Sequence, residues 1–235
     1  MTLLKAHSVS RQFGGLKAVD GVDFELQQGE IRAIIGPNGA GKTTFVSLLC
    51  GRLEVSDGRI VFDQEDITNL PAYQRARRGI AYTFQITSIY PRLTAYENVA
   101  IAAQNALQQD QSVHERAVQA MESAGIAHLG KERAGDLAYG HQRVLEVTMG
   151  LAMSPRLLIL DEPTQGLSDG EIDQFCRLVR QVSERATVLL IEHNMQVVMT
   201  LAQTITVMDQ GRILAQGRPE EIQNDAAVQA AYLGT

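Results

Sequence analysis

The sequence predicts an α/β protein with a mainly parallel core sheet, an N-terminal antiparallel β subdomain and an inserted helical subdomain. Residues 31–35, 157–160 and 188–191 are short segments that are apolar throughout except for Arg32, which is typical of parallel strands covered on both faces. Helical segments separate them, as they do in α/β folds. With 235 residues, the chain is expected to be one large domain with subdomains and not two independent domains.

The antiparallel part is predicted from the first ninety residues. Over residues 22–26, apolar side chains alternate with acidic ones, which indicates a strand with one buried and one solvated face. A second strand is expected over residues 58–62, after the turn Ser56-Asp57-Gly58. These strands predict a small antiparallel sheet beside the first part of the core.

The helical block covers residues from about 94 to 153. Thr94 with Glu97, and Ser112 with Glu115, fit the capping box, in which a hydroxyl and a carboxylate satisfy each other's backbone N–H groups. We therefore expect a helical subdomain within a chain that otherwise forms one domain.

The expected boundaries lie in loops near prolines. A single domain spans 1–235, with about 1–90 and 154–235 forming the core and the antiparallel β subdomain. The helical subdomain occupies about 91–153.

Charge and composition exclude several classes of protein. The chain has 21 Lys and Arg residues and 27 Asp and Glu residues, which gives it a net charge of −6. An acidic chain is not expected to have nucleic acid as its main partner. The cluster Arg75, Arg77 and Arg78 is expected to be a solvated face. No apolar run approaches the roughly 18 residues of a membrane-spanning helix, and the N-terminus lacks the plan of a signal peptide. The chain is therefore expected to stay in the cytoplasm or to reach a membrane only through a partner.

A phosphate-binding loop is predicted at residues 36–43, which match the pattern G-x-x-x-x-G-K-[S/T]. Its glycines let backbone N–H groups point at phosphate oxygens. Lys42 adds positive charge for the β- and γ-phosphates, and the Thr43 hydroxyl can ligate Mg²⁺. A helix follows, and its N-terminal dipole favours an anion. The predicted nucleotide-binding residues here are Gly36, Pro37, Asn38, Gly39, Ala40, Gly41, Lys42, Thr43 and Thr44.

Two carboxylates, Asp161 and Glu162, follow the apolar segment 157–160. Many α/β strands end in an acid, so this pattern alone leaves a purely structural role equally open. Beside a phosphate loop, it predicts that Asp161 holds Mg²⁺ through water and that Glu162 polarises the attacking water as general base. His193 follows the third apolar strand, at the edge where α/β folds bind ligands, with an ordinary loop histidine as the alternative.

The order and spacing of these residues resemble the ATPase subunits of ATP-binding cassette (ABC) transporters over essentially the whole chain. Besides the phosphate loop, the resemblance includes Gln85 after Tyr82-Thr83-Phe84, the motif Leu137-Ala138-Tyr139-Gly140-His141-Gln142, the pair Asp161-Glu162, and His193. The motif at 137–142 is the most specific. Phe13-Gly14-Gly15-Leu16 and Ile191-Glu192-His193-Asn194-Met195 are similar to one branch, the ATP-binding subunits of branched-chain (hydrophobic) amino acid uptake systems.

The resemblance implies roles for individual residues. Phe13 would stack on adenine, with an ordinary core aromatic as the alternative. Gln85 would contact Mg²⁺ and the attacking water, and His193 would contact the γ-phosphate. Two subunits would close head-to-tail around two ATP molecules. The residues acting in trans on the partner's nucleotide would be Ala138, Tyr139, Gly140 and His141.

The resemblance also implies ATP and Mg²⁺ as cofactors and a set of partners. These are a second ABC ATPase subunit in a homodimer or heterodimer, integral-membrane permease subunits and an external substrate-binding protein. The expected function is ATP hydrolysis that energises uptake of branched-chain or hydrophobic amino acids. Import of urea or short amides and export of a lipid are alternatives.

Functions of another class are disfavoured. A soluble ABC ATPase acting on DNA would need long coiled coils, for which the spacing between Lys42 and Asp161 leaves no room. The ribosomal type usually joins two ATPase units, whereas this chain has one phosphate loop. A regulator that binds nucleotide without hydrolysis is disfavoured by Glu162.

Several residues depart from the family pattern. Ala138 offers no hydroxyl where many ABC ATPases have serine, and His141 is less familiar at its position. Ser168 stands where many relatives carry aspartate, which bears on communication between sites. Tyr82 stands where the amino acid branch often has arginine, and the helical insert is shorter than in many amino acid importers. These last two features bear on the substrate more than on the ATPase.

Overall fold

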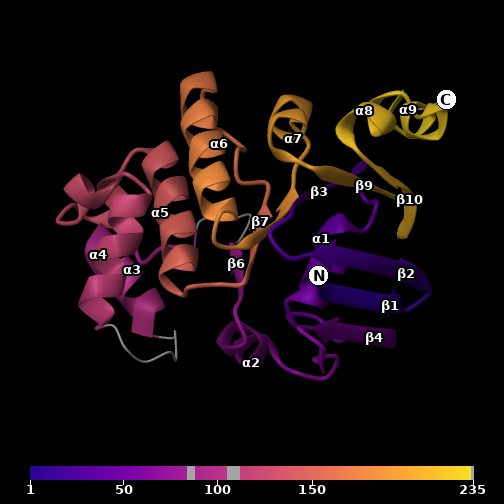
Figure 1. Ribbon diagram of the computed structural model, residues 1–235, viewed down its shortest axis with the longest axis horizontal. Coiled ribbons are helices and arrows are strands. Elements are labelled where there is room, and N and C mark those ends of the chain that lie inside the picture. Colours follow the sequence, from indigo (N-terminus) through magenta and orange to yellow (C-terminus); the bar gives the residue numbers. More distant parts are fainter. Residues whose placement is uncertain (84–87, 105–111, 234–235) are drawn as a thin grey trace.

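The larger of two β-sheets forms the centre of the molecule (Figure 1). The computed structural model describes residues 1–83, 88–104 and 112–233. The strand order of this sheet is β10-β9-β3-β8-β7-β6. Its strands are β3 (Ile31–Ile35), β6 (Ile80–Thr83), β7 (Leu157–Asp161), β8 (Thr187–Ile191), β9 (Thr204–Asp209) and β10 (Arg212–Gly217). Neighbouring strands are parallel except for β9 and β10. The three predicted apolar strands are β3, β7 and β8, and every residue in them is buried, which confirms the predicted fold class.

The smaller sheet is antiparallel, with the order β2-β1-β4-β5. It consists of β1 (Thr2–Phe13), β2 (Leu16–Gln27), β4 (Asp57–Phe62) and β5 (Glu65–Asp66). The alternation predicted for residues 22–26 is present, with the apolar side chains buried and the acidic ones exposed. The sequence pattern does not predict β1, because register shifts along its pairing with β2 interrupt the alternation of burial.

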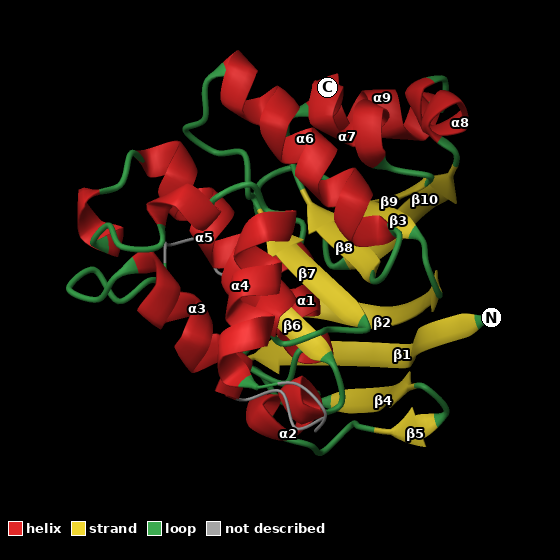
Figure 2. Ribbon diagram, turned by 60° about the vertical axis from the view of Figure 1, so that its left-hand side comes forward, coloured by secondary structure: helices red, strands yellow, loops and turns green. Residues whose placement is uncertain are grey.

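Helices cover both faces of the larger sheet (Figure 2). They are α1 (Lys42–Leu49), α2 (Ala72–Arg77), α3 (Ala95–Gln104), α4 (Val113–Ser123), α5 (Tyr139–Ala152), α6 (Asp169–Ser183), α7 (Met195–Leu201), α8 (Pro219–Gln223) and α9 (Ala226–Leu233). Helix α1 packs between the two sheets, where Ile159 of β7 shares its hydrophobic cluster. On the opposite face, Leu158 and Leu160 pack with α6 and α7.

A separate hydrophobic cluster joins α3, α4 and α5 at one end of the molecule (Figure 1). The capping boxes predicted at Thr94 and Ser112 both form, at the starts of α3 and α4. None of the described helices is long and apolar enough to cross a bilayer.

The buried position of Arg75 corrects the predicted solvated face. Its two neighbours in the basic cluster are exposed, but Arg75 itself is 1% exposed. Its guanidinium donates to the carbonyls of Thr68, Leu70, Leu48 and Leu49, at 2.7 to 2.9 Å. The last two carbonyls belong to the C-terminal turn of α1, whose backbone acceptors have no partner within the helix. Arg75 therefore ties α2 to the helix that begins at the phosphate loop, and burial lowers its pKa to about 10.

Candidate nucleotide-binding site

The phosphate loop connects β3 to α1, and two of its glycines are fixed by close backbone contacts. Gly36 has φ 151° and Gly41 has φ 95°. A Cβ atom at Gly36 would lie 2.1 Å from the carbonyl oxygen of Met208, and one at Gly41 would lie 2.3 Å from that of Ala18. Neither position can accept a larger residue without moving backbone, so β9 and β2 close directly on the loop.

Along the loop, the predicted residues alternate between exposed and buried positions. Asn38 and Gly39, at the tip of the loop, and Thr43, at the start of α1, are exposed. Pro37 and Thr44 are half-buried, and Ala40 is buried.

The Lys42 ammonium lies folded back on the phosphate loop. Its Nζ donates to the carbonyls of Gly36, at 2.7 Å, and Pro37, at 2.9 Å. Burial lowers the pKa of Lys42, and the carboxylates of Glu162 and Asp161 oppose that shift. The structure thus brings the predicted lysine and both predicted carboxylates into one electrostatic environment.

Asp161 ends β7 with one carboxylate oxygen bound and the other unsatisfied. Its Oδ2 accepts a 2.6 Å hydrogen bond from the Tyr82 hydroxyl. Its Oδ1 is buried and has no hydrogen-bond partner among the described residues. Burial raises the pKa of Asp161, and the hydrogen bond from Tyr82 opposes this. A buried oxygen without a hydrogen-bond partner is unusual in a folded protein. Because Mg²⁺ binds carboxylate oxygens, this oxygen is a candidate metal ligand.

Glu162 has a backbone conformation that only a minority of non-glycine residues adopt. Its φ is 47°, and its N–H donates to the carbonyl of Ile191 at 2.9 Å. Such left-handed residues cost about 1–3 kcal/mol and cluster at functional sites. The bond to Ile191 anchors Glu162 to the end of β8, the strand that precedes His193.

Glu192 is a component of the site that the sequence analysis missed. It is fully buried and accepts hydrogen bonds from the N–H and hydroxyl of Thr164 and from the N–H groups of His193 and Asn194, the latter two at 2.9 and 3.1 Å. It therefore links the loop after β7 to the loop after β8, while the side chain of His193 is exposed. The signal in the sequence is a charged residue directly after the apolar run Val188–Ile191.

The motif at 137–142 starts helix α5. Ala138, Tyr139 and His141 are exposed, and Gly140 is buried. A Cβ at Gly140 would lie 2.1 Å from Oε1 of Glu171, so a larger residue at this position would displace the Glu171 side chain.

The same Glu171 explains why a serine fits at position 168. Its Oε2 accepts from the Ser168 N–H at 2.8 Å and from the Ser168 hydroxyl at 2.6 Å, which forms the capping box of α6. These bonds, with a smaller contribution from His141, lower the pKa of Glu171. Ser168 thus begins α6 directly beside the motif.

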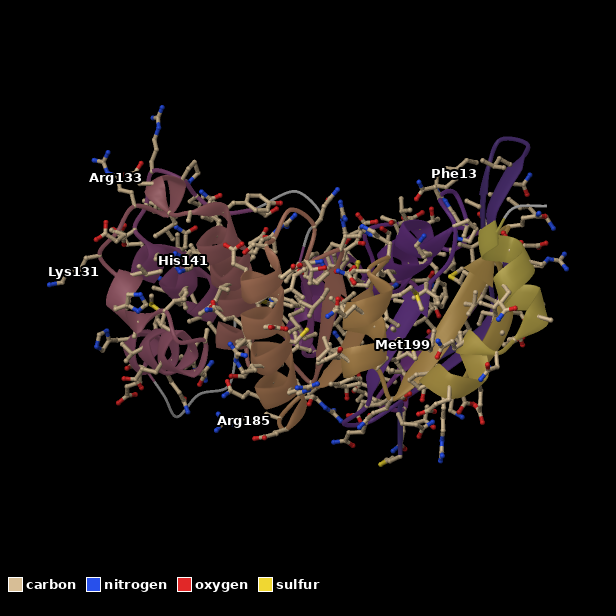
Figure 3. The ribbon with its side chains drawn as sticks, turned by 90° about the horizontal axis from the view of Figure 1, so that it is seen from above. Phe13, Lys131, Arg133, His141, Arg185 and Met199 are labelled. Carbon is tan, nitrogen blue, oxygen red and sulfur yellow. The ribbon has the colours of Figure 1, made fainter. Side chains whose placement is uncertain are left out.

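One chain does not bring all the predicted residues together. Phe13 is 44% exposed, with the Arg11 guanidinium 4.8 Å from the centre of its ring, so it is not a core aromatic. Phe13 and His141 lie toward opposite ends of the molecule (Figure 3). Gln85 lies outside the described residues.

Comparisons with known proteins agree with this geometry. The family model described as ABC transporter matches residues 19–165, and the model for branched-chain amino acid ATP-binding cassette transporters matches residues 212–235. The high-affinity branched-chain amino acid transport ATP-binding protein BraF of Pseudomonas aeruginosa is 36% identical, over 99% of this chain and 98% of that protein.

Two further proteins are similar over their whole length. The lipopolysaccharide export system ATP-binding protein LptB of Haemophilus influenzae is 33% identical, over 100% of this chain and 98% of that protein. The crystal structure of a nucleotide-free ATP-binding cassette from an ABC transporter superposes with a TM-score of 0.91 at 30% identity, covering 100% of both chains. With the phosphate loop, the paired carboxylates and the motif at 137–142, these similarities show that the chain belongs to the ATP-binding subunits of the ABC transporter family.

Proposed function

We propose that this chain binds ATP with Mg²⁺ and hydrolyses it to energise uptake of branched-chain or hydrophobic amino acids. The ATPase activity is supported by one observation above all. Lys42, Asp161 and Glu162 lie close enough to interact electrostatically at the carboxyl ends of the parallel strands. The cargo is supported by the near full-length similarity to BraF and by the family match at 212–235. The chain would work in the cytoplasm, bound to the inner face of the cell membrane through permease subunits.

Nucleotide binding would use groups that the phosphate loop presents. On binding, Lys42 would exchange the carbonyls of Gly36 and Pro37 for phosphate oxygens, which carry full charge. Thr43, Gln85 and Asp161 are the proposed residues around Mg²⁺. The buried Oδ1 of Asp161, which has no hydrogen-bond partner within residues 1–83, 88–104 and 112–233, fits such a cation. Bound Mg²⁺ would neutralise charge on the phosphates.

Hydrolysis would occur at the ends of two adjacent strands. Glu162, after β7, would accept the proton of the water that attacks the γ-phosphate. His193, after β8, would contact the γ-phosphate, and Glu192 holds the backbone on which His193 stands. The ends of parallel strands are where α/β folds place their ligands.

A second subunit would complete each site. Because Phe13 and His141 lie toward opposite ends of the molecule (Figure 3), one copy would not direct both at one nucleotide. We infer a head-to-tail dimer, identical or mixed, in which residues 138–141 face the partner's ATP. Ala138 supplies no hydroxyl to that phosphate, a difference of about 1.5–3 kcal/mol for one hydrogen bond to a charged group. ATP-driven closure would then act on the permeases.

Replacing Glu192 tests how the two catalytic loops are held. A glutamine has one acceptor oxygen, so two of the four donors around Glu192 would face an NH₂ group and stay buried without an acceptor. Glu192→Gln is expected to lower kcat about tenfold, because about 1–3 kcal/mol of hydrogen bonding that positions the loops is lost. Its Kd for ATP should remain unchanged. Steady-state phosphate release and calorimetry measure the two quantities.

The matched variant for this test is Thr164→Val, which removes only the hydroxyl donor to Glu192. It should have a smaller effect on kcat than Glu192→Gln. An unchanged kcat and melting temperature in Glu192→Gln would contradict the assignment of Glu192 as a positioning residue.

Purification from native membranes in mild detergent, followed by mass spectrometry, tests the proposed transporter. Two multi-spanning subunits, a second ATPase and an external binding protein are expected to copurify. That binding protein should bind leucine, isoleucine or valine. A complex of lipid-export components would favour the function of LptB instead, and binding of urea or short amides would change the cargo. Ribosomal or DNA-repair proteins without membrane chains would contradict the transporter.

A further inference from the structure

Tyr82 lies in direct contact with the carboxylate proposed to serve Mg²⁺. It stands on β6, the edge strand, where it pairs with Ile159 of β7. Asp161 is two residues further along β7, so Tyr82 and Asp161 are on the same face of the sheet. The hydroxyl donates to Oδ2 of Asp161 at 2.6 Å, and Oδ1 is buried with no hydrogen-bond partner in the part of the chain that the structure describes.

The ring of Tyr82 is itself held in place. It packs against the main hydrophobic cluster of the core, and the Arg52 guanidinium lies 5.2 Å from its centre. Arg52 follows the end of α1, so the ring stands between the helix of the phosphate loop and the strand of Asp161. A tyrosine phenol carries its proton at neutral pH, so the Tyr82 hydroxyl is the donor in its bond to Asp161.

We propose that Tyr82 is a positioning residue that orients the Asp161 carboxylate toward Mg²⁺. It holds Oδ2 with a neutral donor and thereby directs Oδ1 to the metal side. This inference rests on the proposed MgATP site.

The chemistry of the donor explains why tyrosine suits this position. A neutral hydroxyl fixes the carboxylate and leaves its full negative charge for a divalent cation, whereas an arginine would add a positive charge beside the metal. Without the hydroxyl, the carboxylate could rotate and turn an oxygen to Lys42 or Arg52, both of which act on it electrostatically. Groups that hold a metal ligand from behind typically change metal affinity 10–100-fold when removed.

Tyr82→Phe tests the proposal and keeps the ring between Arg52 and the core. The non-hydrolysable analogue AMP-PNP is titrated by calorimetry in EDTA and at increasing Mg²⁺, and Mn²⁺ binding to the AMP-PNP complex is followed by electron paramagnetic resonance. The metal-free Kd for AMP-PNP should be unchanged. The Mn²⁺ Kd, and the Mg²⁺ concentration that gives half-maximal stimulation of binding, should rise about tenfold.

Two comparisons make the test specific. Tyr96→Phe removes a hydroxyl that is hydrogen-bonded to His114 at 2.9 Å in the helical region, and it should leave the Mn²⁺ Kd unchanged. In an Asp161→Asn background, Tyr82→Phe should have no further effect on metal-dependent binding, because Tyr82 acts through that carboxylate. An additive effect there would overturn the proposal.

The outcomes also separate this inference from the proposed function. If the unchanged protein binds AMP-PNP with metal dependence and Tyr82→Phe has the same Mn²⁺ Kd, the positioning role of Tyr82 is wrong and the ATP site stands. If the unchanged protein shows no metal-dependent binding, both are wrong. Thermal unfolding of each variant confirms that it is folded.

Discussion

Glu162→Gln is expected to release phosphate from ATP roughly 10²–10⁴-fold more slowly than the unchanged protein, the usual contribution of a general base. The substitution removes the carboxylate proposed to accept the proton of the attacking water. It changes one oxygen to an NH₂ group and leaves the shape of the side chain intact. The hydrogen bond from the backbone N–H of Glu162 to the carbonyl of Ile191 anchors the left-handed backbone at this position. It does not involve the side chain and should persist.

Binding should respond differently from turnover in the same variant. The Kd for ATP should stay within about twofold, because Lys42 and the phosphate loop are untouched, and the stalled protein should accumulate as an ATP-bound dimer. Phosphate release, calorimetry and light scattering after gel filtration measure these quantities. Glu184→Gln, at an exposed glutamate beyond the end of α6, serves as the control and should behave like the unchanged protein. Undiminished turnover in Glu162→Gln would remove Glu162 from its proposed role.

Arg75→Met is expected to have the largest effect on stability. The substitution retains an apolar stem but leaves the carbonyls of Leu49, Leu70 and Thr68 without their buried donor, whereas the Leu48 carbonyl keeps the N–H of Gly51. Stranded acceptors cost about 1–3 kcal/mol each, and relief of the buried charge offsets part of the sum, so we expect a net loss of about 3 kcal/mol. For a chain of this size, that corresponds to a melting temperature lower by about 6–12 °C. Differential scanning calorimetry measures it.

Arg77→Met is the matched control, because Arg77 is on the same helix and exposed. It should change the free energy of unfolding by no more than about 1 kcal/mol, since its ring contact with Tyr73 is exposed. Equal melting temperatures for the two variants would show that the bonds of Arg75 to α1 do not stabilise the fold.

Local sequence patterns made the central strands and two helix starts predictable. Strands β3, β7 and β8 are buried on both faces, so nearly all their residues must be apolar, and short continuous apolar runs of this kind are typical of parallel strands in an α/β protein. The capping boxes at Thr94 and Ser112 depend only on groups three residues apart, and both form. The phosphate loop is equally local, because its glycines and lysine lie within eight positions.

Features that depend on contacts between distant segments were not predictable in this way. Glu192 accepts hydrogen bonds from Thr164, and Tyr82 donates a hydrogen bond to Asp161 on the neighbouring strand. The burial of Arg75 depends on carbonyls of α1 that are far from it in the sequence. In each case, a polar residue that could equally well be solvated is buried because another element supplies its partners, and local patterns do not record those partners.

ATP hydrolysis at this site is expected to drive amino acid uptake, and leucine transport by the purified complex tests this most directly. The complex is reconstituted in proteoliposomes with its ATPase side supplied with ATP and Mg²⁺ and the binding protein on the other side. Radiolabelled leucine should accumulate on the ATPase side, and replacing the chain by its Glu162→Gln variant should abolish that accumulation. ATP hydrolysis by the unchanged complex without any movement of leucine, isoleucine or valine would contradict the proposed function.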